Sequence, residues 1–344
     1  MSRRPRVLVV DDSAFARTVL SRMLKASGAI DVIGTARDGT EALAQIEAAD
    51  PDLVTLDLTM PDQDGLDVLR ALQGRQRPRV LVVSVSTIDS AAGVEALTLG
   101  AIDVVSKPTA LASDRLYELG SELVTKVLAA TAGLDTPPPP PLPAPAANRV
   151  LAGPTELVLI GTSTGGPQAL TRVLAALPAD LDAAVAVVLH IPVGYTEALA
   201  RRLDQSSPLE VVEAHDGVEM RHRRVVLARA GMHLKLDRNG DTLVGRLDAV
   251  PIQPHVPSVD ELFKSGARVA GATCLGVVLT GMGDDGLEGA REIAAGGGAL
   301  LTESASSAVV YGMPRVVFEA GLGARQATLD HIPSEIIRHV QARR

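Results

Sequence analysis

Ser163 lies between glycines in the stretch LIGTSTGGPQAL, residues 159–170, directly after a run of apolar residues. A glycine-rich turn of this kind either holds a phosphate group or presents the serine as a nucleophile. A phosphate-binding Walker loop has a lysine after its last glycine, and this stretch has none. The spacing of Gly161, Gly165 and Gly166 also differs from the dinucleotide-binding pattern G-x-G-x-x-G. The stretch therefore favours a nucleophilic serine.

Two further groups with suitable chemistry follow apolar runs elsewhere in the chain. His190 ends the run AAVAVVLH, and Asp284 and Asp285 follow CLGVVLTGMG. Because ligands bind at the carboxyl ends of the strands of an open sheet, we expect these side chains to meet Ser163 there. An imidazole can accept the serine proton, and a carboxylate can orient that imidazole. Backbone N–H groups of the glycine turn, that of Thr164 among them, would face a developing oxyanion.

Each of these residues also has a purely structural interpretation. A single histidine at a strand end is more often part of the packing, and one aspartate of GMGDDG can cap a helix. All three groups at strand ends together favour a Ser–His–Asp triad. Their order along the chain differs from the Ser…Asp…His order of α/β-hydrolases, so that fold is disfavoured. The residues alone do not choose between Asp284 and Asp285.

A second group of polar residues follows the apolar runs of the N-terminal part. Asp11 and Asp12 end the first run, Asp57 the third and Ser84 the fourth, and Lys107 follows the fifth. Clustered carboxylates repel one another, and a divalent cation that prefers oxygen ligands, such as Mg²⁺, relieves that repulsion. A carboxylate there can attack a phosphoryl group, whose oxygens the serine and lysine would bind. The alternative of polar strand ends and a surface lysine is weaker, because all five residues fall at strand ends.

A proline-rich segment separates the two groups of polar residues and marks a domain boundary. The segment 131–149, TAGLDTPPPPPLPAPAANR, contains seven prolines and is typical of a semi-rigid tether. We therefore expect an N-terminal domain over residues 1–128, a proline-rich linker over residues 129–152 and a catalytic domain over residues 153–344.

Both domains are expected to be α/β. In the first, five short apolar runs alternate with five helical patterns, which predicts a flavodoxin-like (βα)5 fold with a parallel sheet. The second begins in the same way, with ELVLIG, PQALTRVLAAL and AAVAVVLH, and predicts a doubly wound α/β fold. Its middle contains LEVVEA, RVVLA, MHLKLD and DTLVGRL, with DRNGD as a hairpin turn, and suggests an antiparallel insertion.

Composition excludes several classes of function. The 344 residues have a formal net charge of −8 and only 2% aromatic residues, which argues against nucleic acid as a partner. No apolar run approaches the roughly 20 residues needed to span a bilayer, and the N-terminal run is too short for a signal peptide, so we expect a cytoplasmic protein. The single cysteine, Cys274, lies in ATCLGVVLT and is expected to be a buried, inert thiol.

The N-terminal domain resembles the receiver domain of two-component response regulators over nearly its full length. The similar stretches are VLVVDDSAFAR, LDLTMPDQDGL, VVS and SKP. The resemblance implies that Asp57 is the phosphorylated aspartate. It also implies that Asp12, Asp57 and the backbone carbonyl of Thr59 bind Mg²⁺, with Asp11 assisting.

The same resemblance implies that Ser84 and Lys107 sense the phosphoryl group and that the peptide between Lys107 and Pro108 is cis. One position departs from the family. Receivers often have an aromatic switch residue three positions before the lysine, and Val104 stands there. Phosphorylation is therefore expected, but the aromatic-rotation account of signalling does not carry over.

The C-terminal domain is similar to the catalytic domain of the protein-glutamate methylesterases of bacterial chemotaxis. The similar stretches are IGTSTGGPQAL, HIPVGYTEALARRL, HVPSVDELF, LTGMGDDGLEGAREI and VVYGMPRVV. The resemblance implies Ser163 as nucleophile, His190 as base, Asp285 as orienting acid and the backbone of Met282 in the oxyanion hole. The family usually has asparagine where Asp284 stands, and this comparison assigns the acid role to Asp285. The segment ARAGMH, residues 228–233, replaces the family's usual APGDRH, which affects the expected substrate contacts but not the triad.

The implied activity is phosphorylation-activated hydrolysis of glutamate γ-methyl esters on chemoreceptors, with deamidation of receptor glutamines, for sensory adaptation. Mg²⁺ is expected for receiver phosphorylation, and no cofactor for the esterase step. The expected partners are methyl-accepting chemotaxis receptors and a chemosensory histidine kinase. A monomer is expected, with the unphosphorylated receiver covering the Ser163 cleft. Two alternatives remain open: a phosphorylation-dependent binding module, and a serine esterase or amidase of a chemosensory pathway unrelated to motility.

Overall fold

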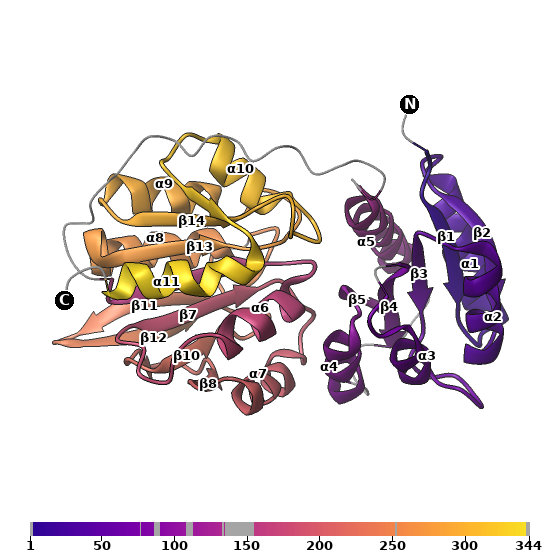
Figure 1. Ribbon diagram of the computed structural model, residues 1–344, viewed down its shortest axis with the longest axis horizontal. Coiled ribbons are helices and arrows are strands. Elements are labelled where there is room, and N and C mark those ends of the chain that lie inside the picture. The colour runs from indigo at the N-terminus through magenta and orange to yellow at the C-terminus, as the bar shows by residue number, and fades with distance from the viewer. Residues whose placement is uncertain are drawn as a thin grey trace. The chain divides into compact units, whose positions relative to one another are not determined.

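The computed structural model describes residues 3–75, 77–85, 90–107, 113–132, 134, 155–251 and 253–341. The chain forms two compact units, Met1–Pro137 and Pro138–Arg344, each of which is an α/β layer structure (Figure 1). Pro108 and most of the proline-rich segment lie outside the described residues, so the cis peptide and the linker stay predictions. The last helix of the first unit continues to Thr131, past the predicted domain end at residue 128.

The first unit is built on a five-stranded sheet with the order β2-β1-β3-β4-β5. Every neighbouring pair of strands is parallel, which confirms the flavodoxin-like prediction. Helix α1 contacts α5, while α2 contacts α3 and α3 contacts α4, so helices cover both faces. The elements are β1 (Arg6–Val10), α1 (Ala14–Ala26), β2 (Asp31–Ala36), α2 (Gly39–Ala49), β3 (Leu53–Leu56), α3 (Gly65–Leu72), β4 (Arg79–Val85), α4 (Ser90–Leu99), β5 (Asp103–Lys107) and α5 (Ser113–Thr131).

Helix caps fix the loops that follow the strands of this unit. The side chains of Ser13, Asp38 and Asp64 each accept a hydrogen bond from an N–H in the first turn of α1, α2 and α3. Strand β3 is buried along its whole length, as expected for a parallel strand covered on both faces. The acidic residues at the strand ends therefore lie on a rigid edge.

The second unit is built on a seven-stranded sheet with the order β15-β14-β13-β6-β7-β10-β8. All of its strand pairs are parallel. Its strands are β6 (Leu157–Thr162), β7 (Ala184–Leu189), β8 (Glu210–Glu213), β10 (Arg224–Leu227), β13 (Cys274–Val278), β14 (Ala299–Glu303) and β15 (Arg325–Ala327). Cys274 is buried, as predicted, and burial raises the pKa of its thiol to about 12.

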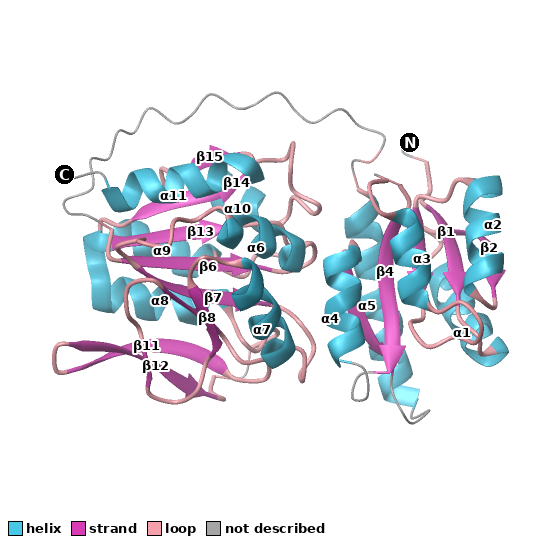
Figure 2. Ribbon diagram, turned by 60° about the horizontal axis from the view of Figure 1, so that its bottom comes forward, coloured by secondary structure: helices cyan, strands magenta, loops and turns pink. Residues whose placement is uncertain are grey.

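Two groups of helices pack around this sheet, and this confirms the doubly wound prediction (Figure 2). One group is α6 (Gly166–Ala175), α7 (Thr196–Ser206) and α11 (Ile332–Gln341); the other is α8 (Val259–Ala270), α9 (Leu287–Ala295) and α10 (Met313–Glu319). Short 3₁₀ helices lie at Gly271–Thr273 and Leu329–His331. Within the described part of the chain, no helix is long and apolar enough to cross a membrane.

The antiparallel insertion is present but smaller than the sequence suggested. Strands β11 (His233–Asn239) and β12 (Thr242–Asp248) form the predicted hairpin, and β9 (Val218–Glu219) pairs with β12. Gly240 in the turn has a φ of 62°, a conformation that favours glycine. The segments LEVVEA and RVVLA, in contrast, supply β8 and β10, which extend the parallel sheet because each follows a crossover connection rather than a hairpin.

Candidate active site and phosphorylation site

The register of β6 and β7 places Ser163 and His190 side by side. Thr162 and Leu189 are partners across these parallel strands, and Ser163 and His190 are the next residues of each strand. The N–H of His190 also donates to the carbonyl of Thr162 at 3.1 Å. Adjacent strands lie about 4.8 Å apart, so the two functional residues begin from neighbouring positions at one edge of the sheet.

Ser163 lies on a tight turn between β6 and α6. Its N–H donates to the carbonyl of Thr280 at 3.0 Å, and its own carbonyl accepts from the N–H of Gly166 at 2.7 Å. Gly165 has a φ of 82° and is the N-cap of α6. A helix N-terminus leaves N–H groups without helical partners, so the turn presents the serine close to donors that suit a negative charge.

The imidazole of His190 is paired with Asp285, as the triad prediction requires. The distance from His190 Nε2 to Asp285 Oδ2 is 2.8 Å, and both side chains are about 10% exposed. Among the described groups, nothing hydrogen-bonds to the buried Nδ1 of His190. The neighbouring Asp284 is exposed. The geometry therefore separates the two aspartates that the residue types alone left equivalent.

Three further donors hold Asp285 at the start of helix α8. The hydroxyl of Ser258 and the N–H of Asp260 donate to Oδ1, each at 2.9 Å, and the N–H of Val259 donates to Oδ2 at 2.8 Å. Burial by itself would raise the pKa of the Asp285 carboxyl, but the hydrogen bond and charge of His190 and the backbone N–H groups lower it to about 2. Asp285 is thus held as a carboxylate by His190 and by the N-terminus of helix α8.

The loop after β13 places Met282 near the serine turn. Gly281 lies so close to Ser163 that a Cβ on Gly281 would come within 3.0 Å of the serine Cβ. The N–H of Gly281 donates to the carbonyl of Val310 at 3.0 Å, and a Cβ on Gly312 would lie 3.2 Å from the Cα of Met282. The backbone of Met282 is therefore fixed at the same strand-end edge as the nucleophile.

Thr280 connects the serine turn to a buried carboxylate. Its carbonyl accepts from the hydroxyl of Thr162 at 2.7 Å and from the N–H of Ser163, and its own hydroxyl donates to the carbonyl of Thr164 at 2.9 Å. The N–H of Thr280 donates to Glu303 Oε2 at 2.8 Å. Glu303 is fully buried, and burial raises the pKa of its carboxyl. The backbone around the serine is thus held by a polar network beneath it.

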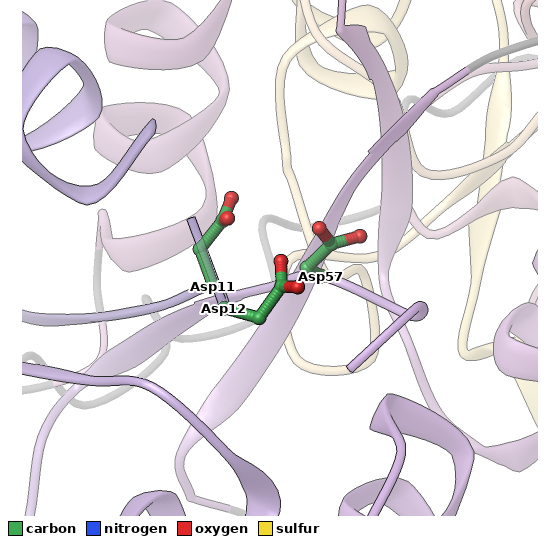
Figure 3. A group of neighbouring side chains, drawn as sticks. All are labelled: Asp11, Asp12 and Asp57. Atoms are coloured by element: carbon green, nitrogen blue, oxygen red, sulfur yellow. The ribbon is translucent and has the colours of Figure 1, made fainter. Parts of the chain in front are cut away.

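The three carboxylates of the first unit converge at the ends of β1 and β3 (Figure 3). One oxygen each of Asp11, Asp12 and Asp57 lies within 4.8 Å of the other two. A set of carboxylate oxygens of this kind fits a hard cation such as Mg²⁺. Thr59 lies beside the cluster, and its N–H donates to Asp57 Oδ1 at 3.4 Å.

Lys107 reaches into the same cluster from the end of β5. Its Nζ lies 2.6 Å from Asp11 Oδ2 and 2.5 Å from Asp57 Oδ2. Burial raises the pKa of the Asp57 carboxyl, as does the charge of Asp11, whereas the charge and hydrogen bond of Lys107 oppose this effect. Ser84 is buried on β4 opposite Ser106 of β5. The five side chains therefore gather at one edge of the sheet, as the strand-end rule predicted.

Several residues of the hydrolase site were missed by sequence reasoning. The ring of His255 stacks on the ring of His190, with centroids 4.2 Å apart and an interplanar angle of 14°. Ser258 caps helix α8 and also binds the Asp285 carboxylate. The pattern Ser258-x-x-Glu261 before an apolar run is a capping signal that could have identified this serine. No comparable signal marks His255, Thr280 or Glu303.

The first unit has a receiver-type sheet with an acidic edge, and the second has serine, histidine and aspartate at the ends of its strands. Together these features define a response regulator whose output domain is a hydrolase. Residues 158–336 match the CheB methylesterase family model, and residues 7–118 match the response regulator receiver domain. The methylesterase match, residues 158–336, by itself spans more than half of the chain. The protein belongs to the CheB methylesterase family.

Relatives of this family resemble the chain over nearly its whole length. The protein-glutamate methylesterase/protein-glutamine glutaminase 5 of Myxococcus xanthus is 54% identical over 341 residues, covering 98% of each chain. The protein of the same activities from Symbiobacterium thermophilum is 42% identical, again over 98% of each chain. The solved CheB methylesterase catalytic domain of Thermotoga maritima covers 53% of this chain and 97% of its own, with 37% identity and a TM-score of 0.52.

Proposed function

We propose that this protein hydrolyses the γ-methyl esters of glutamate side chains on methyl-accepting chemoreceptors and deamidates receptor glutamines at the same site, in sensory adaptation. Its family and the names of its relatives support this substrate class. The observation that carries the proposal is the His190–Asp285 pair beside Ser163 at the edge of one parallel sheet. These residues supply a nucleophile, a base and an orienting acid, so ester hydrolysis needs no cofactor.

The reaction follows from the protonation of His190. Because Nε2 donates its proton to Asp285, Nδ1 has the lone pair and accepts the proton of the Ser163 hydroxyl. The serine oxygen bonds to the ester carbonyl carbon, and Nδ1–H then protonates the departing methoxide to give methanol. A water molecule attacks the acyl-serine in the second half, losing its proton to Nδ1, and the glutamate carboxylate leaves with Ser163 regenerated. With glutamine as substrate, ammonia leaves in place of methanol.

The oxyanion of both tetrahedral intermediates would be bound by backbone N–H groups of Thr164 and Met282. Thr164 lies in the serine turn, and Met282 follows the close contact between Gly281 and Ser163. Preorganised N–H donors of this kind stabilise charge that develops only in the transition state. The Thr280 network is therefore expected to serve catalysis by holding both donors in place.

The receiver would accept a phosphoryl group on Asp57 from a chemosensory histidine kinase. Asp12, Asp57 and the carbonyl of Thr59 would hold Mg²⁺, with Asp11 assisting, and the cation would offset the charge of the incoming phosphoryl oxygens. Lys107 lies within hydrogen-bonding distance of Asp57, and Ser84 lies on the adjacent strand, so both are suited to bind the phosphoryl group. Phosphorylation would release the hydrolase unit from restraint by the receiver.

The experiment that tests the proposal is methanol release from methylated chemoreceptor, with and without Mg²⁺ and a small phosphodonor. Release should rise with the phosphodonor, stay at the basal level in Asp57→Asn and vanish in Ser163→Ala. Absence of release from wild-type protein with demonstrably phosphorylated Asp57 would favour a phosphorylation-dependent binding module instead. Release from receptors of a pathway unrelated to motility, but not from chemotaxis receptors, would reassign the substrate.

A further inference from the structure

The stacked pair of His190 and His255 has no role in the chemistry described above. The rings are nearly parallel, with centroids 4.2 Å apart, and the ring of His190 is paired with Asp285. His255 lies in the segment between β12 and α8, far from His190 in sequence. Aromatic rings usually prefer offset or edge-to-face contact, and a close parallel contact restricts the tilt of both rings.

The backbone on both sides of His255 is anchored. His233, which is fully buried, accepts a hydrogen bond at Nδ1 from the N–H of Ser258 (3.1 Å) and donates from Nε2 to the carbonyl of Pro251 (2.7 Å). The carbonyl of Val256 accepts an N–H from the segment between β10 and β11 at 3.0 Å. The ring of His255 is thus presented to His190 by a segment held at several points.

We propose that His255 is a positioning residue that fixes the ring plane of His190 during the reaction. A single hydrogen bond to Asp285 holds one atom of the imidazole but leaves the ring free to pivot about that bond. The stacked face of His255 removes this pivot, so Nε2–H stays directed at Asp285 while Nδ1 stays directed away from it. The inference deepens the proposed esterase function and rests on it.

The role requires a flat ring and no proton transfer. His255→Phe keeps an aromatic face, His255→Ala removes it, and His255→Leu fills the volume without a planar surface. Losing the stack should lower kcat roughly tenfold, because aromatic contacts of this kind are worth about as much as one factor of ten in rate. KM should change less than twofold, since the base acts in the chemical step and not in substrate binding.

The test combines turnover with an NMR signature in full-length protein. The Nε2–H protons of His190 and His233 are both held in hydrogen bonds away from water, so each should give a low-field imidazole proton resonance. A His190→Gln spectrum assigns the first, and the second serves as an internal control for folding. In His255→Ala the His190 resonance should broaden through exchange with water while that of His233 remains, and His255→Phe should keep both.

The proposal is overturned if His255→Ala retains the His190 resonance and full kcat. It is also overturned if His255→Phe lowers kcat and broadens the His190 resonance as much as His255→Ala does. If His255→Ala also loses the His233 resonance, His255→Leu becomes the deciding variant, with a lost His190 resonance supporting the proposal and a retained one overturning it. If wild-type protein releases no methanol, the proposed function fails, but the spectra of the same variants still decide whether His255 orients His190.

Discussion

His190 donates its Nε2–H to Asp285 across 2.8 Å, which leaves the lone pair of the imidazole on Nδ1. In serine proteases of the chymotrypsin type the two nitrogens have the opposite roles, with Nδ1–H bound to the aspartate and Nε2 facing the serine. The difference follows from the direction of approach, because Asp285 comes from the loop after β13, and β6 with its serine lies between β13 and β7. The imidazole therefore reaches Asp285 with Nε2, the ring nitrogen that lies farther from its own backbone.

Asp285→Asn should reduce kcat for methanol release by about 10⁴-fold, by analogy with the corresponding change in a serine protease. The amide would donate to Nε2 and move the ring proton to Nδ1, where it blocks acceptance of the serine proton. The matched control is Asp284→Asn, because the neighbouring aspartate is exposed whereas Asp285 pairs with His190; the kcat of this control should stay within twofold. Equal effects of the two changes would contradict the assignment of the acid.

Gly165→Ala should destabilise the hydrolase unit and lower its activity. The residue has a φ of 82°, and an added Cβ would lie 2.7 Å from the Cβ of Val309. The strained backbone alone costs on the order of 1–3 kcal/mol, and the clash adds to this. Gly240→Ala is a suitable comparison, since its φ is also positive at 62° but nothing lies within 4 Å of the added atom. Urea unfolding should show a larger decrease in the free energy of unfolding for Gly165→Ala than for Gly240→Ala. Equal decreases would rule out the clash with Val309.

Relative to the wild type, Glu303→Gln should gain stability as the pH rises above 4.5, the ordinary glutamate pKa, and through the raised pKa of buried Glu303. Burial raises the pKa of the Glu303 carboxyl above its ordinary value of 4.5, so the folded state favours the protonated form. The stability contributed by such a group is present at low pH and is lost as the pH rises through the folded-state pKa. Glutamine cannot ionise, its oxygen can still accept from Thr280 N–H, and its amide can donate to Ser307 Oγ.

The measurement is the free energy of unfolding of both proteins across this pH range. Glu303→Ala provides the contrast, because it leaves the Thr280 N–H without its acceptor and should lose about 1–3 kcal/mol or more. A constant difference between wild type and Glu303→Gln at every pH would show that Glu303 does not titrate as its burial implies.

Asp12→Asn should weaken Mg²⁺ binding by at least about tenfold, since one of the clustered carboxylates is lost. Isothermal titration calorimetry of the full chain measures this directly, without any dependence on phosphorylation. Asp31→Asn removes an exposed carboxylate at the start of β2, away from the carboxyl ends of the strands. This variant should bind Mg²⁺ with the affinity of the wild type. Unchanged affinity in Asp12→Asn would place the cation elsewhere.

Much of the fold was predictable because parallel strands covered on both faces are continuous apolar runs, as in β6 and β7. The strand-end rule then brought Ser163 and His190 together without further information. The topology of β8 and β10 was harder, because four-residue strands contain no signal that distinguishes a parallel neighbour from a hairpin partner.

The supporting residues of the site could not be read from sequence. Thr280 Oγ and the Thr164 carbonyl are 116 positions apart, so no spacing pattern relates them. Glu303 and His255 gain their importance only from residues that the folded chain brings against them. Periodicity and motifs report the elements and their ends, whereas a network beneath a turn depends on packing between strands that are distant in the chain.

The separation of the triad along the chain has a consequence during translation. Asp285 follows His190 by 95 residues, and β13, which precedes the acid, pairs directly with β6, the strand that ends just before Ser163. Domains generally fold in the order of their synthesis, so the receiver is complete before the central pairing of the hydrolase sheet can form. A ribosome therefore never carries a finished hydrolase without a finished receiver, and new copies of the enzyme emerge with their regulatory unit already in place.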